Sequence, residues 1–307
     1  MAETSYKDLL VYFNGDFVPW AEATIHIYSP AVKYGAGVFE GIRGYWSDAD
    51  ERMHLFRVAD HLRRLEYSQK MMRFDRIFTA DEFAAPLDEL IRRNRFRESV
   101  HIRPTVYVDG TGESAAKGPV DSFIVAIPRG TPEHVHSGCR VQVSSWQRSS
   151  DLAMPSRVKA NANYNNSRFA AIQAKVDDYD TALMLNARGQ VSEGPGMCIF
   201  IVRGGMPTTP SITSNILESI TRATLIDLLR DDLELACVER EIDRSELYDA
   251  EEAFFCGTLW EITPIIEFDG IPVGDGTIGP VTKKLQRAYF DLVMGIAPDP
   301  HGWRTTL

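Results

Sequence analysis

The sequence predicts a mixed α+β fold made of two domains. The chain has 307 residues, about twice the length of an average domain. Short apolar runs typical of strands alternate with segments of helical periodicity, and no internal repeat is visible. Residues 129–138 are rich in turn formers and mark a boundary. We therefore expect a small N-terminal α/β domain over residues 1–128, an interdomain loop over 129–138 and a larger C-terminal α/β domain over 139–307.

The N-terminal half opens with a predicted β-hairpin over residues 9–18. Asn14 and Gly15 form a strong two-residue turn signal between two apolar segments. Apolar residues at helical spacing, such as Leu62 and Leu65, predict helices over residues 59–71 and 80–94. Apolar and alternating runs predict the strands of this half, at residues 21–27, 42–46, 54–57, 100–108 and 122–128.

A similar succession of elements follows the interdomain loop. Helical periodicity recurs at residues 167–175, 222–231 and 280–294. Predicted strands lie at residues 140–145, 181–186, 198–203, 234–239 and 252–256. This half therefore has enough strands and helices to form an α/β domain of its own.

Composition and charge exclude several function classes. A net charge of −10 makes general binding to nucleic acid or to an anionic membrane unfavourable. No apolar run approaches the ~20 residues of a membrane helix, and residues 1–8 lack the apolar core of a signal peptide. The four cysteines lack the paired spacing of zinc sites, which predicts reduced thiols and no bound metal. We therefore expect a cytoplasmic protein.

Lys159 lies in the most informative segment of the chain, residues 157–167. Small residues with little charge lie around it, and Tyr164 follows five positions later. A lysine that attacks a carbonyl must first lose a proton from a group with an ordinary pKa of ~10.4, which apolar neighbours favour. The glycine spacing at residues 35–41 does not match a dinucleotide loop, and no P-loop, zincin or α/β-hydrolase motif is present.

Eight groups of residues, in order along the chain, resemble the class IV (fold type IV) pyridoxal-phosphate aminotransferases. The branched-chain amino-acid aminotransferases are the members that the chain resembles most, over about residues 11–295. The matching motifs lie at residues 34–43, 55–57 with 61–65, 102–104, 158–167, 192–194, 219–222, 257–258 with 261–264, and 279–283. The resemblance implies the D-amino-acid aminotransferase-like two-domain fold, pyridoxal 5'-phosphate as cofactor and a homodimer or higher homo-oligomer.

The resemblance also implies roles around the cofactor. Lys159 would hold it through a Schiff base and carry the proton that leaves the substrate Cα. Glu193 would face the pyridine nitrogen, and Tyr164 would hydrogen-bond the ring O3'. Leu217 would pack against the ring. The phosphate would be bound by Arg57, Ile220, Thr221 and Thr258.

On the substrate side, the sequence both matches the family and departs from it. Tyr34 and Phe39, beside Gly41, would form an aromatic pocket for an aliphatic side chain. Arg43 and Arg103 match basic residues of that pocket, and Arg103 would receive the distal carboxylate of glutamate or 2-oxoglutarate. The departures are His101 in place of a tyrosine, Arg129 in place of an aromatic residue of the interdomain loop, and Leu259 in place of an alanine beside Thr258.

The predicted activity is therefore the transfer of an amino group between an L-amino acid and a 2-oxo acid by a ping-pong cycle. Branched-chain amino acids and glutamate are the expected amino donors. The departures at His101, Arg129 and Leu259 leave an (R)-selective amine:pyruvate transaminase as the alternative. A D-amino-acid transaminase, an aminodeoxychorismate lyase and a non-catalytic relative fit the same residues less well.

Overall fold

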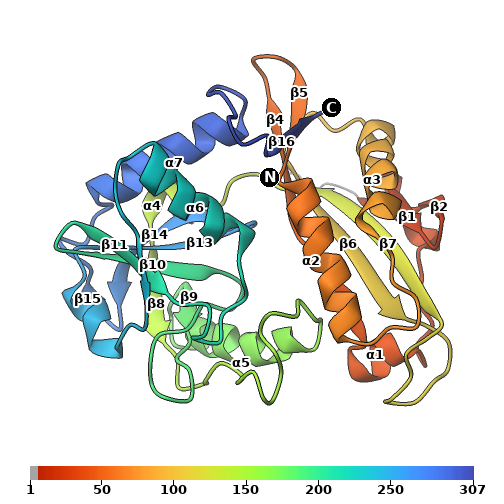
Figure 1. Cartoon of the computed structure of the whole chain (residues 1–307), viewed down its shortest axis with the longest axis horizontal. Helices are drawn as coiled ribbons and strands as arrows, with labels where there is room; N and C mark the ends of the chain where they lie inside the picture. The colour runs from red at the N-terminus through yellow and green to blue at the C-terminus, as the bar shows by residue number, and fades with distance from the viewer. Residues whose placement is uncertain (1–5) are drawn as a thin grey trace. The chain divides into compact units, whose positions relative to one another are not determined.

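The chain folds as two units, each built on its own β-sheet, in a computed structural model that describes residues 6–307 (Figure 1). Unit 1 contains the chain up to Gly130 together with Val158–Ala162 and Leu292–Leu307, and unit 2 contains Thr131–Arg157 and Asn163–Asp291. Residues 1–5, where the expected N-terminal domain starts, lie outside the described part. Within residues 6–307, no helix combines the length and apolar character needed to cross a membrane.

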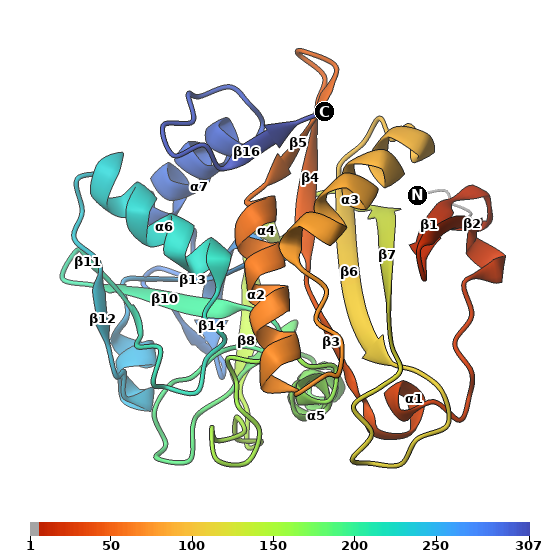
Figure 2. The same ribbon diagram turned by 45° about the vertical axis from the view of Figure 1, so that its right-hand side comes forward.

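Unit 1 is organised around an antiparallel sheet with the strand order β16-β5-β4-β6-β7-β1-β2, and β3 pairs with β6 beside this path. The longest strands, β6 and β7, run side by side in yellow in Figure 2. The bounds are β1 Leu10–Phe13, β2 Asp16–Pro19, β3 Gly37–Phe39, β4 Ile42–Ser47, β5 Arg52–Phe56, β6 Val100–Val108, β7 Val120–Pro128 and β16 Arg304–Thr306.

Two long helices supply much of the core of unit 1. They are α2 (Val58–Met71) and α3 (Ala80–Asn94), and the short α1 (Pro30–Tyr34) precedes β3. α3 begins at a capping box in which Thr79 and Glu82 satisfy each other's main-chain N–H groups. Both helices bury an apolar stripe, which removes it from water and stabilises the unit. The stripe residues are Leu62 and Leu65 of α2 and Phe83, Leu87, Leu90 and Ile91 of α3.

Unit 2 contains a mixed sheet with the strand order β12-β11-β10-β13-β14-β8-β9, and β15 pairs with β14. In Figures 1 and 2, α5 lies on the opposite side of this sheet from α6 and α7. The strands are β8 Cys139–Val143, β9 Thr181–Leu183, β10 Cys198–Arg203, β11 Met206–Pro210, β12 Val238–Arg240, β13 Glu252–Gly257, β14 Glu261–Phe268 and β15 Ile271–Pro272. The helices are α4 His134–Ser137, α5 Asn163–Val176, α6 Ile220–Asp231 and α7 Pro280–Val293.

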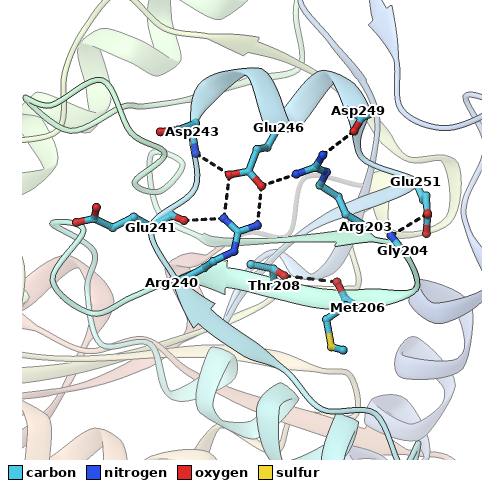
Figure 3. Close-up of polar contacts among 10 residues, drawn as sticks. All are labelled: Arg203, Gly204, Met206, Thr208, Arg240, Glu241, Asp243, Glu246, Asp249 and Glu251. Carbon is cyan, nitrogen blue, oxygen red and sulfur yellow. Dashed lines mark hydrogen bonds and ion pairs between the residues drawn. The ribbon is translucent and has the colours of Figure 1, made fainter.

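An ionic network fastens one end of this sheet to the 3-10 helix η3 (Arg244–Asp249). The carboxylate of Glu246 accepts hydrogen bonds from Arg203 at 2.6 Å and from Arg240 at 2.8 and 2.6 Å (Figure 3). Arg203 also contacts Asp249, and the main-chain N–H of Asp243 donates to Glu246. The Arg240 hydrogen bonds are the main cause that lowers the pKa of Glu246 to about 2.

The structure confirms most of the predicted elements, among them the hairpin at residues 9–18 and the helix at 80–94. The predicted strand at residues 21–27 is wrong. Trp20–Glu22 is a 3-10 turn, and Ile27 is exposed without a sheet neighbour to pair with. The strand predicted at residues 234–239 is reduced to Val238–Arg240, where β12 pairs with β11.

Two segments of the C-terminal half fold with unit 1, although the sequence suggested one continuous C-terminal domain that carries Lys159. Val158–Ala162 attaches to β3 through a bridge between Val38 and Ala160. The C-terminal strand β16 pairs with β5 and completes one edge of the unit 1 sheet. Main-chain hydrogen bonding therefore joins parts of the chain that composition and turn signals cannot connect.

Candidate active site

The position of Lys159 is fixed by main-chain hydrogen bonds within unit 1. The N–H of Phe39 donates to the carbonyl of Lys159 at 3.0 Å, and the N–H of Asn161 donates to the carbonyl of Gly37 at 2.9 Å. The N–H of Lys159 donates to Ser68 Oγ, on α2, at 3.3 Å. Lys159 Nζ lies 4.9 Å from the centre of the Phe39 ring. The segment therefore presents its amine beside an apolar ring, from a backbone that is held on both sides.

Unit 1 also carries a group of positively charged side chains around one imidazole, which we call the cationic cluster. Its members are Lys159, Arg43, Arg103 and Arg129, and the imidazole is that of His101. Arg43 of β4 is paired in register with His101 of β6, and Arg103 follows two positions later on β6. The Arg103 guanidinium lies 3.7 Å from the centre of the Phe39 ring, and Arg43 Nη1 donates to the carbonyl of Arg129 at 2.6 Å. Burial and the neighbouring charges, Arg103 first, lower the pKa of His101 to about 3. His101 is consequently neutral at physiological pH.

Gly41 leaves the space that His101 occupies. A Cβ atom added at residue 41 would lie 2.9 Å from His101 Nε2, which is closer than real Cβ contacts allow. Tyr34 is half exposed at the end of α1, where its hydroxyl donates to Glu113 at 2.8 Å. Of the residues proposed for substrate binding, Phe39, Gly41, Arg43, His101 and Arg103 therefore lie together on the β3, β4 and β6 strands and the turn between β3 and β4.

A buried ionic group supports the turn that follows Phe39, and sequence reasoning gave it no role. Glu40 is fully buried and accepts hydrogen bonds from Arg64 Nε at 2.6 Å, Arg64 Nη2 at 2.8 Å and His61 Nδ1 at 2.7 Å. Burial alone would raise the pKa of Glu40, but Arg64 and His61 lower it far below its ordinary value. His61 and Arg64 are three residues apart on one face of α2, so the sequence indicates that they can share a partner but not that the partner is Glu40.

Arg57 is held rigidly at the start of α2. It adopts a left-handed conformation with φ of 53°, and its N–H donates to the carbonyl of Trp303 at 2.7 Å. Its Nε donates to Asp60 at 2.6 Å, and its guanidinium lies 4.6 Å from the centre of the Trp303 ring. A permanent cation at a helix N-terminus forms a favourable site for a phosphate group.

In unit 2, Glu193 is a buried carboxylate surrounded by hydrogen-bond donors. Arg148 Nε donates to Oε1 at 2.8 Å, and the N–H of Leu217 donates to Oε2 at 3.0 Å. The thiol of Cys198 lies 3.9 Å from the same Oε2 and 3.6 Å from the carbonyl of Leu217, so its single proton is shared between two acceptors. Sequence reasoning missed Arg148, because nothing in its neighbourhood of the sequence relates it to residue 193.

Helix α6 begins soon after Leu217, the residue whose N–H donates to Glu193. Ser219 caps the helix by accepting a hydrogen bond from the N–H of Arg222 at 3.2 Å. Ile220 and Thr221 open the 12-residue helix, where main-chain N–H groups have no partner within the helix. Such a terminus binds anions through its N–H groups and its positive dipole end. Thr258 and Leu259 follow the end of β13.

The residues of unit 2 fit the functional groups of pyridoxal 5'-phosphate. Glu193 offers a buried acceptor for a ring N–H, and the α6 terminus offers N–H donors for a phosphate. The Tyr164 ring lies beside Gly196, since a Cβ added there would be 3.9 Å from it. The segment that carries Glu193 therefore lies beside the Tyr164 ring, and its Glu193 carboxylate accepts a hydrogen bond from the N–H of Leu217.

Comparison with known proteins identifies the family. Residues 37–268 match the family model described as amino-transferase class IV. The chain is 38% identical to a probable branched-chain-amino-acid aminotransferase of Aquifex aeolicus, covering 98% of this chain and 97% of the relative. It is also 38% identical to the branched-chain-amino-acid aminotransferase of Escherichia coli, with 98% of each chain covered.

Solved structures of the same family have the same fold. The branched-chain aminotransferase of Thermoproteus uzoniensis with norvaline has 41% identity and a TM-score of 0.92, covering 97% of this chain and 99% of that one. The holo-form enzyme of Thermobaculum terrenum, with pyridoxal phosphate, has 41% identity and a TM-score of 0.91, covering 98% and 99%. These matches confirm the predicted α+β class with the type IV architecture. The chain therefore belongs to the class IV aminotransferases and is a pyridoxal-phosphate-dependent aminotransferase.

Proposed function

We propose that this aminotransferase acts on branched-chain L-amino acids, with glutamate and 2-oxoglutarate as the other donor and acceptor pair. One observation carries the proposal: the Phe39 ring lies beside both Lys159 Nζ, at 4.9 Å, and the Arg103 guanidinium, at 3.7 Å. An apolar ring next to a guanidinium offers contacts for an aliphatic side chain and for a distal carboxylate. Relatives named branched-chain-amino-acid aminotransferases support the same substrate class.

The cofactor supplies an electron sink that stabilises negative charge at the substrate Cα. In the proposed assignment, Lys159 Nζ binds the cofactor and moves the proton between the substrate Cα and the cofactor. Glu193 accepts the hydrogen bond of the ring nitrogen, Tyr164 bonds the ring O3', and Leu217 packs against the ring. The residues assigned to the phosphate are Arg57, Ile220, Thr221 and Thr258. The rigid setting of Arg57 and the helix terminus at Ile220 support that assignment.

The cationic cluster favours amino acids over simple amines. Arg43, Arg103 and Arg129 surround a neutral His101, so the positive charge of the cluster attracts carboxylates. An (R)-amine without a carboxylate gives these groups no counter-charge. The cluster therefore argues against the (R)-amine:pyruvate alternative, even though His101, Arg129 and Leu259 depart from the family pattern.

We also propose that the protein forms a homodimer. Phe169, Ile172 and Val176 are exposed and lie at helical spacing on α5, and the Trp146 ring stacks on Phe169 at 5.0 Å. An apolar helix face of this kind is typical of a surface that another chain covers. Sedimentation should give a dimer mass for the wild type and a smaller mass for Ile172→Asp. The free cysteines fit a reducing compartment, and we propose the cytoplasm, which cell fractionation tests.

An absorbance experiment tests the substrate assignment. The cofactor-loaded enzyme is mixed separately with L-leucine, L-glutamate and (R)-1-phenylethylamine, and its long-wavelength band is followed. Loss of the band with both L-amino acids and not with the amine supports the proposal. Loss with the amine, and little with the amino acids, overturns it in favour of the amine transaminase.

A further inference from the structure

Arg148 binds the carboxylate that we assign to the ring nitrogen, and it is buried together with that carboxylate. The Arg148 and Glu193 side chains are each 6% exposed, and Nε lies 2.8 Å from Oε1. Arg148 follows β8, where its N–H donates to the carbonyl of Leu185 at 2.8 Å, and its Nη1 donates to Asn166 Oδ1 at 3.4 Å. Asn166 is itself fixed through Nδ2 to the carbonyl of Gln147 at 2.9 Å. The guanidinium is therefore held in place from two sides.

The two oxygens of Glu193 have different environments. Oε1 is bound by the permanent cation Arg148, whereas Oε2 accepts the neutral N–H of Leu217 and lies near the thiol of Cys198, a weak donor that is closer to the carbonyl of Leu217. A carboxylate can accept about four hydrogen bonds, so capacity remains for one further donor. A buried carboxylate without a cation would tend to bind a proton instead of staying charged.

We infer that Arg148 is a positioning residue that keeps the proton shared by Glu193 and the cofactor on the ring nitrogen. The inference rests on the proposed role of Glu193. A proton on Glu193 would place positive charge close to the Arg148 guanidinium, which is unfavourable. A proton on the ring nitrogen would be farther from Arg148, with the carboxylate between them. Arg148 therefore disfavours the neutral acid and favours the anion paired with a protonated ring. Because the protonated ring withdraws electrons more strongly, the proton at the substrate Cα is released more readily.

The test uses holoenzyme loaded with pyridoxal 5'-phosphate labelled with 15N in the ring. The ring nitrogen's NMR shift reports directly whether that atom is protonated. Arg148→Gln keeps an N–H donor near Glu193 but removes the charge, and we expect its signal to move toward the neutral-pyridine position. Arg148→Lys restores the charge and should keep the signal near that of the wild type. Arg148→Gln should also lower kcat about tenfold while KM changes little, as expected when an interaction of the chemical step is lost.

Three further variants separate the possible explanations. Glu193→Gln should move the ring signal by itself, and adding Arg148→Gln to it should produce no additional change, because Arg148 acts through the carboxylate. That double variant also removes the unpaired buried charge, so it remains informative if Arg148→Gln alone does not fold. Arg230→Gln, which changes an exposed arginine of α6 paired with Asp227 and Asp231, is the matched control and should leave the signal unchanged.

The outcomes distinguish this inference from the proposed function. If Glu193→Gln moves the signal and Arg148→Gln does not, the inference about Arg148 is wrong and the role of Glu193 stands. If the double variant moves the signal further than Glu193→Gln alone, Arg148 does not act through Glu193 and the inference is likewise overturned. If Glu193→Gln leaves the signal unchanged, the proposed role of Glu193 is wrong and the inference falls with it.

Discussion

The main-chain N–H of Phe39 donates a hydrogen bond to the carbonyl oxygen of Lys159, at 3.0 Å. The bond joins two segments that are far apart in the sequence, one with the reactive amine and one with the aromatic ring. Because the main chain makes it, a change of either side chain leaves the bond itself in place. The local geometry of the nucleophile can therefore be tested separately from its chemistry.

Replacement of the nucleophile should abolish turnover without unfolding the protein. Lys159→Ala removes the amine but retains the main-chain bonds to Phe39 and Ser68. We expect no measurable transamination and an unchanged far-ultraviolet circular dichroism spectrum. Lys175→Ala, at an exposed position of α5, is the control and should be fully active. Transamination by Lys159→Ala would contradict the assignment.

Removal of the Arg103 guanidinium, which lies over the Phe39 ring, should lower activity toward glutamate more than activity toward leucine. With Arg103→Ala we expect kcat/KM for glutamate to fall about 100-fold, since hydrogen bonds to a charged group are worth ~1.5–3 kcal/mol. The value for leucine should fall much less, because an aliphatic side chain needs no cation. Steady-state kinetics with both donors measures the difference, and Arg63→Ala at an exposed position of α2 serves as control. Equal losses for the two donors would place Arg103 away from the substrate side chain.

The close approach of Gly41 and His101 predicts a coupled pair. A Cβ at residue 41 would lie 2.9 Å from His101 Nε2, so Gly41→Ala must displace the imidazole. Overpacking of this kind costs ~1–3 kcal/mol, which corresponds to a decrease in melting temperature of a few degrees. In the His101→Ala background the same change should cost little, because the obstructing ring is gone. Thermal unfolding of the two single variants and the double variant tests the coupling, and additive losses would refute it.

The Glu246 network should contribute stability that depends on pH. The pKa of Glu246 is lowered to about 2 in the folded state from an ordinary value of 4.5. A group with a lowered folded-state pKa adds stability that is complete above 4.5 and is lost as the pH falls toward 2. Glu246→Gln keeps an acceptor for the N–H of Asp243 but removes the charge that Arg203 and Arg240 contact.

At pH 6 we expect Glu246→Gln to be less stable than the wild type by about 1–2 kcal/mol, after allowance for the partly exposed arginines. The difference in melting temperature should be a few degrees and should narrow as the pH is lowered from 4.5 toward 2. Calorimetry across this pH range measures it. A difference that is constant with pH would mean that Glu246 acts through packing and not through its charge.

Local sequence signals predicted the elements whose stabilising contacts are themselves local. The helix at residues 80–94 has a capping box at Thr79 and Glu82 and an apolar stripe, so its bounds follow from the sequence. The strand predicted at residues 21–27 fails because alternation alone does not provide a neighbouring strand for its hydrogen bonds. The family resemblance supplied the fold and the cofactor, which composition and periodicity alone could not.

The supporting residues of the site were less predictable than its principal ones. Arg148 meets Glu193, and Arg64 meets Glu40, only because the fold brings distant segments together. A single sequence contains no pattern that pairs a particular arginine with a particular carboxylate across such separations. The proposed cofactor residues could be named through motifs, but the donors that bind Glu193 became visible only in the folded structure.

The pairing of β16 with β5 sets an order of events during synthesis of the chain. The sheet of unit 1 needs residues 304–306 for its edge, and β3 needs residues 158–162 beside it. The first half of unit 1 emerges from the ribosome long before these segments have been made, so the unit cannot be completed from that half alone. Until these segments have been made, one edge of β5 has no strand to hydrogen-bond with, and the carbonyl of Gly37 has not yet met the N–H of Asn161. Assembly around Lys159 and around Arg57, whose N–H donates to the carbonyl of Trp303, therefore waits for residues that are made much later than β3 and β5.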